Sequence, residues 1–309
     1  MARIAIQPDA HHPYHERWLS QLAARGHRGN LVDVHAPDFL ARIRDFDGLL
    51  WWCPPRPRAR EVAKRLLAAL DHVSSVMVYP DRDSGWHFDD KLAQHYLLQA
   101  AGIPMPRTHV FWREAEARAF VREAAYPFVV KLSSGFRSRN VALVRDRREA
   151  ERWLRRQFPG RFRRLLHAEE RGYLLAQEFV PGNAWDTRVT VVGDRAWASR
   201  RVNRPGDFRA SGSGVLLFEP SEIAQDALDL ARRAARLLGS PTLAVDVVRG
   251  TDGQPLVLEV SYFFEFTGMR DNPGYWQGET FVPGRVIIED FVLDDFLARL
   301  QRSTASRQQ

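Results

Sequence analysis

Short apolar runs alternate with amphipathic stretches at the start of the chain. Four runs have the length and apolar content of buried strands, at residues 3–7, 30–34, 47–52 and 75–79. Helical periodicity fills the gap between the first two runs and the gap between the last two, at residues 15–25 and 58–70. Strands that alternate with helices are typical of a parallel sheet covered by helices. We therefore expect a parallel α/β domain here.

A helix is predicted directly after this domain. Asp89 or Asp90 can cap its first turn, and Gly102 with the prolines that follow can end it. Lys91 then falls in the first turn, where the helix dipole disfavours a cation. Lys91 therefore needs a nearby anion, which is either one of the two aspartates or a bound phosphate.

A lysine interrupts an apolar strand further along the chain. Residues 126–134 read YPFVVKLSS, with Lys131 inside an otherwise buried run, and a second strand follows at residues 141–144. Because an unpaired ammonium is costly to bury, we expect Lys131 to meet an anion. The loop that begins at Gly135, between the two strands, can fold over phosphates.

A hairpin with charged residues is predicted in the C-terminal half. Residues 185–202 form two alternating strands around a Gly-Asp turn, which is a strong hairpin signal. The register of such a turn sets Asp186 opposite Arg201 and Arg188 opposite Ser199. Since alternate residues of a strand share a face, one face of this hairpin is lined with charges.

A second hairpin lies at residues 243–261, with an Asp-Gly turn between its strands. Its register sets Asp246 directly opposite Glu259, and Ser261 lies two residues along on the same face. The other face is apolar in the same register, which pairs Val245 with Val260 and Val247 with Leu258.

The two opposed carboxylates of this hairpin call for an explanation. Like charges directly opposite each other destabilise a sheet unless a cation lies between them. A hard divalent metal such as Mg²⁺, carrying phosphates, would fit between Asp246 and Glu259. The alternative is an exposed hairpin whose carboxylates point into water.

The net charge favours anionic partners. The chain has 309 residues and a formal net charge of +7. The densest basic stretch, at residues 145–171, mixes glutamates with its arginines. That mixture is typical of a solvated helix rather than of a nucleic-acid-binding arm. We therefore expect small anionic partners and no nucleic acid.

Composition and length limit the class of protein further. A hydrophobic content of 45% over this length supports two or three well-filled domains. The apolar stretch at residues 48–53 is too short to span a bilayer, and the N-terminus lacks the pattern of a signal peptide. Cys53 is the only cysteine, which excludes an internal disulfide and a thiolate zinc cluster. We expect a cytoplasmic protein without membrane contact.

The order of these features resembles the ATP-grasp superfamily. The resemblance is carried by DDK at the start of a helix that ends AGIPMP, the strands VVKL and QEFV, the stretch DTRVTVVGDRAWASRRVNRPGDFRASGSG, and the pair AVDVV and LEVS. Within the superfamily, the stretch from DTR to GDFR is most similar to the RimK-like amino-acid ligases. The similarity covers about residues 86–265.

The resemblance implies an α/β chain of the α+β ATP-grasp type. Residues 1–85 would be the parallel pre-ATP-grasp α/β domain, followed by two α+β subdomains that clamp ATP. The central lid subdomain would cover residues 86–180, and residues 181–302 would form the C-terminal subdomain with the metal and phosphate site. A closing helix at residues 289–300 is expected to pack on the C-terminal subdomain, and residues 303–309 are expected to be disordered.

The resemblance also implies roles for individual residues. The residues expected to bind ATP are Lys91, Lys131, Ser133, Ser134, Gly135, Glu178, Phe179, Val180, Asp186 and Arg188. The residues expected to act in catalysis are Arg209, Lys131 and Arg201. The residues expected to hold Mg²⁺ or Mn²⁺ are Asp246, Glu259 and Ser261.

The chain departs from the family pattern at two places. The usual Glu-x-Asn reads Glu259-Val260-Ser261, and a serine oxygen is a weaker metal ligand than an amide oxygen. The loop after Lys131 has arginines at positions 137 and 139 where relatives tend to be glycine-rich. These arginines indicate either tighter phosphate binding or a loop that has lost it.

The chemistry that the resemblance implies is amide or peptide bond formation. A carboxylate would be activated by ATP as an acyl phosphate and captured by an amine, giving ADP and phosphate. The substrates would be small molecules, with an acidic sugar or an amino acid as candidates. Two alternatives remain: a sugar or polyol kinase on the same scaffold, and a basic binding protein with a degenerate site.

Overall fold

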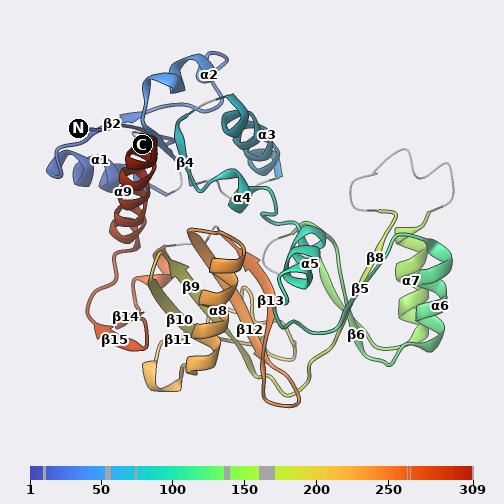
Figure 1. The fold of residues 1–309 in the computed structure, drawn as a ribbon. Helices are drawn as coiled ribbons and strands as arrows, with labels where there is room; N and C mark the ends of the chain where they lie inside the picture. Colours follow the sequence, from blue (N-terminus) through green and yellow to red (C-terminus); the bar gives the residue numbers. More distant parts are fainter. Residues whose placement is uncertain are drawn as a thin grey trace.

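A computed structural model of the protein describes residues 1–9, 12–52, 57–73, 75–135, 140–159, 171–262, 264 and 266–307. Within these residues the strands form two four-stranded sheets and one seven-stranded sheet. Figure 1 shows the N-terminal sheet above the seven-stranded sheet, with the second four-stranded sheet beside the latter at the right. No helix in the described ranges is both long enough and apolar enough to cross a membrane.

The N-terminal domain is built on a parallel sheet, as the alternating pattern predicted. The strand order is β2-β1-β3-β4, and each neighbouring pair runs parallel. The strands are β1 (Arg3–Ile6), β2 (Arg28–Leu31), β3 (Gly48–Leu50) and β4 (Met77–Tyr79). The helices and the 3-10 turn of this part are α1 (Tyr14–Ala24), α2 (Phe39–Arg42), η1 (Ile43–Asp45), α3 (Pro57–Val73) and α4 (Arg82–Gly85).

The last helix of the chain packs on the N-terminal domain. Helix α9 (Ile288–Arg307) runs beside α1 and β4 in Figure 1, and the ring of Phe296 lies edge-on to Tyr79 with centroids 6.0 Å apart. It also touches the seven-stranded sheet, where Phe291 packs against Trp197. The expected packing of this helix on the C-terminal subdomain is therefore confirmed, and the helix packs on the N-terminal domain as well.

The prediction of a disordered tail at residues 303–309 is wrong for residues 303–307. These residues continue α9, which keeps its hydrogen-bonding pattern through Arg307. The hydroxyl of Thr304 donates to the carbonyl of Leu300 one turn back. Residues 308–309 lie outside the described part of the chain.

The central sheet is antiparallel and is covered by two helices. Its order is β5-β8-β6-β7, with strands β5 (Thr108–Phe111), β6 (Phe128–Lys131), β7 (Val141–Val144) and β8 (Leu174–Glu178). Helices α6 (Glu114–Glu123) and α7 (Arg147–Gln157) lie side by side on its outer face in Figure 1. Their apolar stripes share one core with the strands, which leaves the other face of the sheet for the site.

The seven-stranded sheet forms the C-terminal part. Its path is β13-β12-β9-β10-β14-β15, and β11 pairs with β10. The strands are β9 (Trp185–Val192), β10 (Arg195–Val202), β11 (Leu216–Leu217), β12 (Thr242–Arg249), β13 (Pro255–Ser261), β14 (Gly274–Gln277) and β15 (Thr280–Pro283). Helix α8 (Gln225–Leu237) covers one face, and Leu98 of α5 (Lys91–Ala100) belongs to the same core.

Two details of this sheet are not evident from the sequence. Ser221 does not cap α8: it lies in the 3-10 turn η2 (Pro220–Glu222), and its hydroxyl donates to Glu219. The hairpin of β14 and β15 was not foreseen, although Gly278 at its turn has a φ of 60°, a conformation that favours glycine. A second 3-10 turn, η3 (Thr267–Met269), precedes this hairpin.

The predicted registers of the two charged hairpins are confirmed at the charged positions. Asp186 pairs with Arg201, and Asp246 pairs with Glu259. The apolar pairing of Val247 with Leu258 is wrong, because the register shifts after Asp246 and Val247 pairs with Val257. The shift is a β-bulge, which leaves one strand with an extra residue.

Candidate functional site

A pocket lies between the central sheet and the seven-stranded sheet. Its wall comes from strands β6, β7 and β8 on one side and from β9, β10, β12 and β13 on the other. Predicted site residues in this wall come from both sheets: Lys131, Glu178, Phe179, Val180, Asp186, Arg201, Arg209, Asp246 and Glu259. The fold therefore brings together residues that are more than a hundred positions apart in the chain.

Two arginines surround Asp246 on one side of this pocket. Strand β9 lies between β10 and β12, so the Arg188 and Arg201 side chains both reach the carboxylate. Arg188 donates from Nε and Nη2 at 2.7 and 3.0 Å, and Arg201 Nη2 lies 2.6 Å from Oδ2 of Asp246. Arg201 also binds both oxygens of Asp186. These contacts form a buried network of two carboxylates and two guanidiniums.

The contacts in this network shift the pKa values of its residues. Burial acts to raise the pKa of Asp246, but the Arg188 and Arg201 guanidiniums hold that pKa well below its usual range. Burial raises the pKa of Asp186 above its ordinary value, because Arg201 offsets only part of the desolvation. Although burial acts against its charge, the pKa of Arg201 is raised by Asp246 and Asp186. Asp246 is therefore a permanent anion in the wall of the pocket.

Lys131 projects from the end of β6 into the same pocket. Its amine donates to the carbonyl of Leu258 at 3.3 Å, and Leu258 is the extra residue of the β-bulge. Desolvation lowers the pKa of Lys131 to about 8, against the opposing attraction of Glu259. The lysine thus stays protonated near neutral pH, with an incompletely compensated charge that suits an anionic ligand.

Glu259 interacts with a second lysine. The amine of Lys91, whose side chain is only 5% exposed, lies 3.4 Å from Oε1 of Glu259. The same amine donates to the carbonyl of Gly135 at 2.9 Å and lies 3.9 Å from Asp89. The like charges of Asp246 and Glu259 are thus offset by arginine and lysine side chains.

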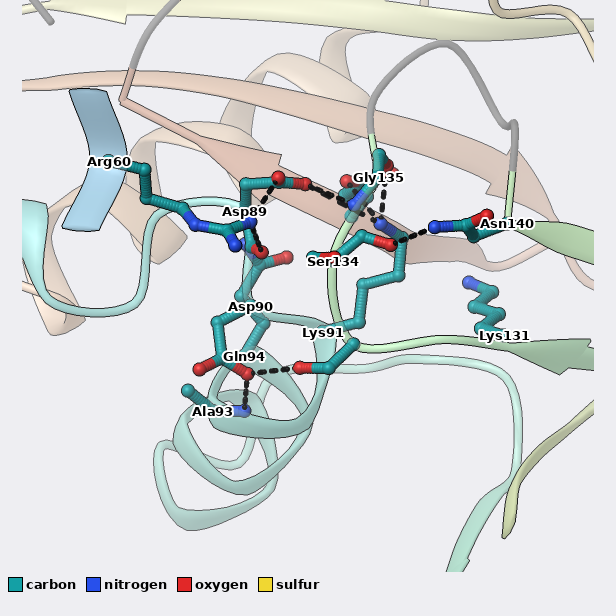
Figure 2. Close-up of polar contacts among 12 residues, drawn as sticks. Arg60, Asp89, Asp90, Lys91, Ala93, Gln94, Lys131, Ser134, Gly135 and Asn140 are labelled. Carbon is teal, nitrogen blue, oxygen red and sulfur yellow. Dashed lines mark hydrogen bonds and ion pairs between the residues drawn. The ribbon is translucent and has the colours of Figure 1, made fainter. Parts of the chain in front are cut away.

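The segment after Lys131 is tied to the start of helix α5. Figure 2 shows Lys91 reaching Gly135, and Asn140 donating to the carbonyl of Ser134. Ser133 donates through its hydroxyl to Asp90 at 2.6 Å, and its backbone N–H donates to the Tyr173 hydroxyl. Asp90 also caps α5, as predicted for Asp89 or Asp90, by accepting from the Ala93 N–H.

The other end of the pocket is formed by the chain segment that joins the two sheets. Glu178, Phe179 and Val180 leave strand β8 there, and the Phe179 ring meets Phe208 edge-on at 5.8 Å. Next to Phe208, Arg209 is held by Asp207 and donates to the carbonyl of Val141 at 3.3 Å. The polar loop that carries Phe208 and Arg209 therefore crosses from the seven-stranded sheet to the central sheet.

Several predicted residues lie beside the pocket rather than in its wall. Lys91 contacts the pocket residue Glu259, and the segment 133–135 follows the pocket residue Lys131 and accepts a hydrogen bond from Lys91. Arg188 donates to the pocket residue Asp246. Ser261 follows Glu259 by two residues on β13 and pairs with Ala244. Positions 137 and 139 of the loop lie outside the described residues.

The carboxylates fit a magnesium ion that carries phosphates. Among the described residues, no three His, Cys, Asp or Glu side chains gather into a site for a metal held by protein alone. Magnesium, however, is usually bound by one or two carboxylates together with substrate phosphates and waters. Asp246 and Glu259 supply that donor set in the wall of one pocket.

Sequence reasoning assigned no role to two residues that shape this site. Phe208 lines the pocket, and the signal was an aromatic residue within a stretch otherwise rich in Gly, Ser and Arg. Arg60 reaches Asp89 from helix α3 at 2.6 Å. Nothing in the local sequence around Arg60 sets it apart from the other arginines of that helix.

Comparisons with known proteins agree with this arrangement. A family model described as RimK-like ATP-grasp domain matches residues 88–272. A probable alpha-L-glutamate ligase from Xanthomonas campestris is 36% identical over 179 residues, which cover 56% of this chain and 56% of that protein. This chain spans about half the length of the curated relatives that it matches.

Solved structures share the fold over nearly the whole chain. The RimK domain ATP-grasp protein from Sphaerobacter thermophilus is 25% identical, with a TM-score of 0.64, and covers 96% of this chain and 100% of its own. The ATP-grasp ligase PsnB, complexed with a minimal precursor, Mg and ADP, is 18% identical with a TM-score of 0.62, covering 97% of this chain and 98% of its own. The expected ATP-grasp fold is confirmed, with its parallel N-terminal sheet and two antiparallel sheets. Because the family match extends over more than half of its residues, the chain belongs to the RimK-like ATP-grasp family.

Proposed function

We propose that this protein is an ATP-dependent carboxylate–amine ligase that forms an amide or peptide bond and releases ADP and phosphate. The observation that carries the proposal is the pocket between the two sheets. Its lining combines the aromatic rings of Phe179 and Phe208 with the charged side chains of Lys131, Asp246 and Glu259. A nucleotide has two parts that match this lining, a flat base and a charged phosphate chain.

The nucleotide is proposed to lie along this pocket. Adenine would rest against the connecting segment of Glu178, Phe179 and Val180, where aromatic and backbone groups are available. The phosphates would meet Lys131 and Lys91, with the segment 133–135 beside them. Asp186 and Arg188 would act indirectly, by holding Arg201 and Asp246 in place.

Asp246 and Glu259 are proposed to hold Mg²⁺ or Mn²⁺ together with the phosphates, and Ser261 is a candidate third ligand. When bound, such an ion would offset the charge that develops on the transferred phosphoryl group. Arg188 and Arg201 keep Asp246 ionised near neutral pH, as a metal ligand must be, and a bound ion would share the Asp246 oxygens with these guanidiniums. PsnB, which shares the fold, is complexed with Mg and ADP, and this supports a metal–nucleotide ligand for the present chain.

The chemical step is proposed to begin when a substrate carboxylate oxygen attacks the γ-phosphorus of ATP, which breaks the bond to the β-phosphate oxygen and releases ADP. Lys131 and Arg209 would stabilise the charge on the phosphoryl oxygens, and Arg201 would contribute through the network around Asp246. An amine then attacks the acyl carbon, phosphate leaves, and the nitrogen loses a proton. No protein nucleophile is required.

The substrates belong to the class of small carboxylic acids and amines. Relatives named probable alpha-L-glutamate ligase make glutamate the first amino acid to test, with other acidic metabolites after it. The basic net charge of the chain is compatible with acidic substrates. We place the reaction in the cytoplasm, where ATP is abundant.

Trapping with hydroxylamine tests this proposal. The protein is incubated with MgATP, glutamate or a metabolite extract, and hydroxylamine, while ADP and new hydroxamates are followed by mass spectrometry. A ligase gives ADP and a hydroxamate, and Glu259→Gln gives neither. ADP with a phosphorylated metabolite and no hydroxamate would instead identify a kinase. Absence of both products, together with absence of MgATP binding, would indicate a degenerate site.

A further inference from the structure

Helix α3 of the N-terminal domain reaches the phosphate end of the site through a largely buried ion pair. Arg60, on helix α3, donates to Oδ2 of Asp89 at 2.6 Å and to the backbone carbonyl of Asp89 at 3.3 Å. The side chains of Arg60 and Asp89 are only 12% and 9% exposed. This pair is thus largely shielded from solvent and differs from the surface ion pairs of the same helix.

Asp89 adopts a backbone conformation that supports this contact. Its φ is 50°, in the left-handed region that residues other than glycine rarely adopt, although aspartate is among those that tolerate it. The turn directs the Asp89 carboxylate toward Gly135 and its carbonyl toward Arg60. The bonds from Arg60 help to hold a conformation that is otherwise unfavourable.

The other oxygen of Asp89 reaches the segment after Lys131. Oδ1 accepts the backbone N–H of Gly135 at 2.9 Å and lies 3.9 Å from the amine of Lys91. Figure 2 shows the resulting chain of contacts from Arg60 through Asp89 to Gly135 and Lys91. The same α3 helix makes a second contact of this kind, since Lys64 lies 3.6 Å from Asp90.

The charge of Asp89 depends on these partners. Burial raises the pKa of Asp89, and the nearby Glu259 adds to that rise, whereas Lys91, the Gly135 N–H and Arg60 act against it. Removal of Arg60 would leave a buried carboxylate with fewer compensating groups, which weakens its hold on Gly135. The position of Gly135 and Lys91 therefore depends on a residue of the N-terminal domain.

We propose that Arg60 and Asp89 are positioning residues of the phosphate site, through which helix α3 sets the backbone at Gly135 and the amine of Lys91. Neither residue needs to touch the nucleotide. The assignment of Gly135 and Lys91 to the phosphates rests on the proposed function, whereas the link from Arg60 to Gly135 does not. The pair should act on the phosphate end alone, since adenine is proposed to lie on a different part of the pocket wall, the segment from Glu178 to Val180.

The test compares Arg60→Gln and Asp89→Asn with Arg65→Gln as the matched control. Arg65 lies on the same helix, but its side chain is 73% exposed and pairs with Glu61 on the surface. Three quantities are measured in the full-length protein: hydrogen exchange at the Gly135 amide without nucleotide, the affinity for MgATP and the affinity for adenosine. If Arg60→Gln does not fold, Arg60→Lys takes its place, because it keeps the charge but loses the forked geometry.

We expect both variants to speed exchange at Gly135, to weaken MgATP binding by about tenfold, and to leave adenosine binding within about twofold. Arg65→Gln should change none of these. Unchanged exchange at Gly135 in a folded Arg60→Gln protein would overturn the inference, as would an equal loss of MgATP and adenosine affinity. If the wild type bound no MgATP while Gly135 still responded to Arg60→Gln, the proposed function would fail and the link would stand.

Discussion

Arg201 Nη2 lies 2.6 Å from Oδ2 of Asp246, the carboxylate that faces Glu259 across the hairpin of β12 and β13. The same guanidinium binds both oxygens of Asp186, so one buried cation serves two buried anions. Because Asp186 and Asp246 share the Arg201 guanidinium, the sheet can hold both carboxylates without a metal ion. This sharing also gives Arg201 a structural role.

Removal of Arg201 is predicted to destabilise the fold. Arg201→Gln leaves Asp186 without its buried partner and Asp246 with only Arg188. Loss of one partner from a buried ion network typically costs about 3–5 kcal/mol, so the urea midpoint should fall clearly. Arg249→Gln is the control, because the Arg249–Asp226 pair is half exposed and should contribute less than about 1 kcal/mol. Equal stability of the two variants would contradict the shared role of Arg201.

The affinity for MgATP is predicted to depend on the protonation of Lys131. Desolvation lowers the pKa of this lysine to about 8, so the free protein loses the ammonium as the pH rises through that value. The ammonium is the form that attracts phosphate, and affinity should then fall by up to about tenfold per pH unit. Titrations of MgATP on either side of this pKa measure the effect. Lys131→Arg should flatten the profile, because arginine stays charged; a flat profile in the wild type would contradict the role of Lys131.

The same lowered pKa predicts a pH dependence of stability. Between about 8 and 10.5 the unfolded chain holds a proton on Lys131 that the folded protein has released. The free energy of unfolding should therefore rise with pH across this window, relative to a variant without the group. Urea unfolding of the wild type and of Lys131→Met at several pH values gives the comparison. If the difference in the free energy of unfolding between the wild type and Lys131→Met does not change between about pH 8 and pH 10.5, Lys131 is not desolvated.

Phe208 is predicted to support the base rather than the phosphates. Its ring packs edge-on against Phe179 in the wall of the pocket, far along the chain from Gly135. Phe208→Ala should weaken the binding of adenosine and of MgATP alike, by about five- to tenfold, since an aromatic contact contributes about 1 kcal/mol. Phe208→Leu keeps an apolar side chain and should lose less. A loss confined to MgATP would contradict this placement of the base.

The sequence was sufficient to predict most of the pairing that forms the site. The Gly-Asp and Asp-Gly turns fixed which residues face each other, and therefore placed Asp186 against Arg201 and Asp246 against Glu259. The bulge at Leu258 could not be foreseen, because no glycine or proline marks it. That bulge provides the carbonyl that Lys131 binds.

Other features depend on contacts between distant segments and leave no local signal. The cations that offset Asp246 and Glu259 come from β9, β10 and α5, and only the folded chain brings them together. The end of α9 was misjudged because residues 301–307 are polar, like a disordered tail, yet helical hydrogen bonding continues through them. The link between Arg60 and Asp89 joins helix α3 to the segment before helix α5 and has no sequence motif.

The most direct test of the central claim is the effect of Mg²⁺ on ATP binding in the wild type and in Glu259→Gln. Isothermal titration with ATP, with and without Mg²⁺, separates the contribution of the metal from that of the nucleotide. Glu279→Gln, an exposed position on the β14–β15 turn, makes the same change of charge away from the pocket and serves as the control.

If Asp246 and Glu259 hold the metal, Mg²⁺ should tighten ATP binding in the wild type and in Glu279→Gln, and Glu259→Gln should lose about tenfold or more of that gain. ATP binding without Mg²⁺ should change little in Glu259→Gln. A Glu259→Gln protein that keeps the full response to Mg²⁺, or a wild type that binds no ATP under either condition, would contradict the assignment of this pocket.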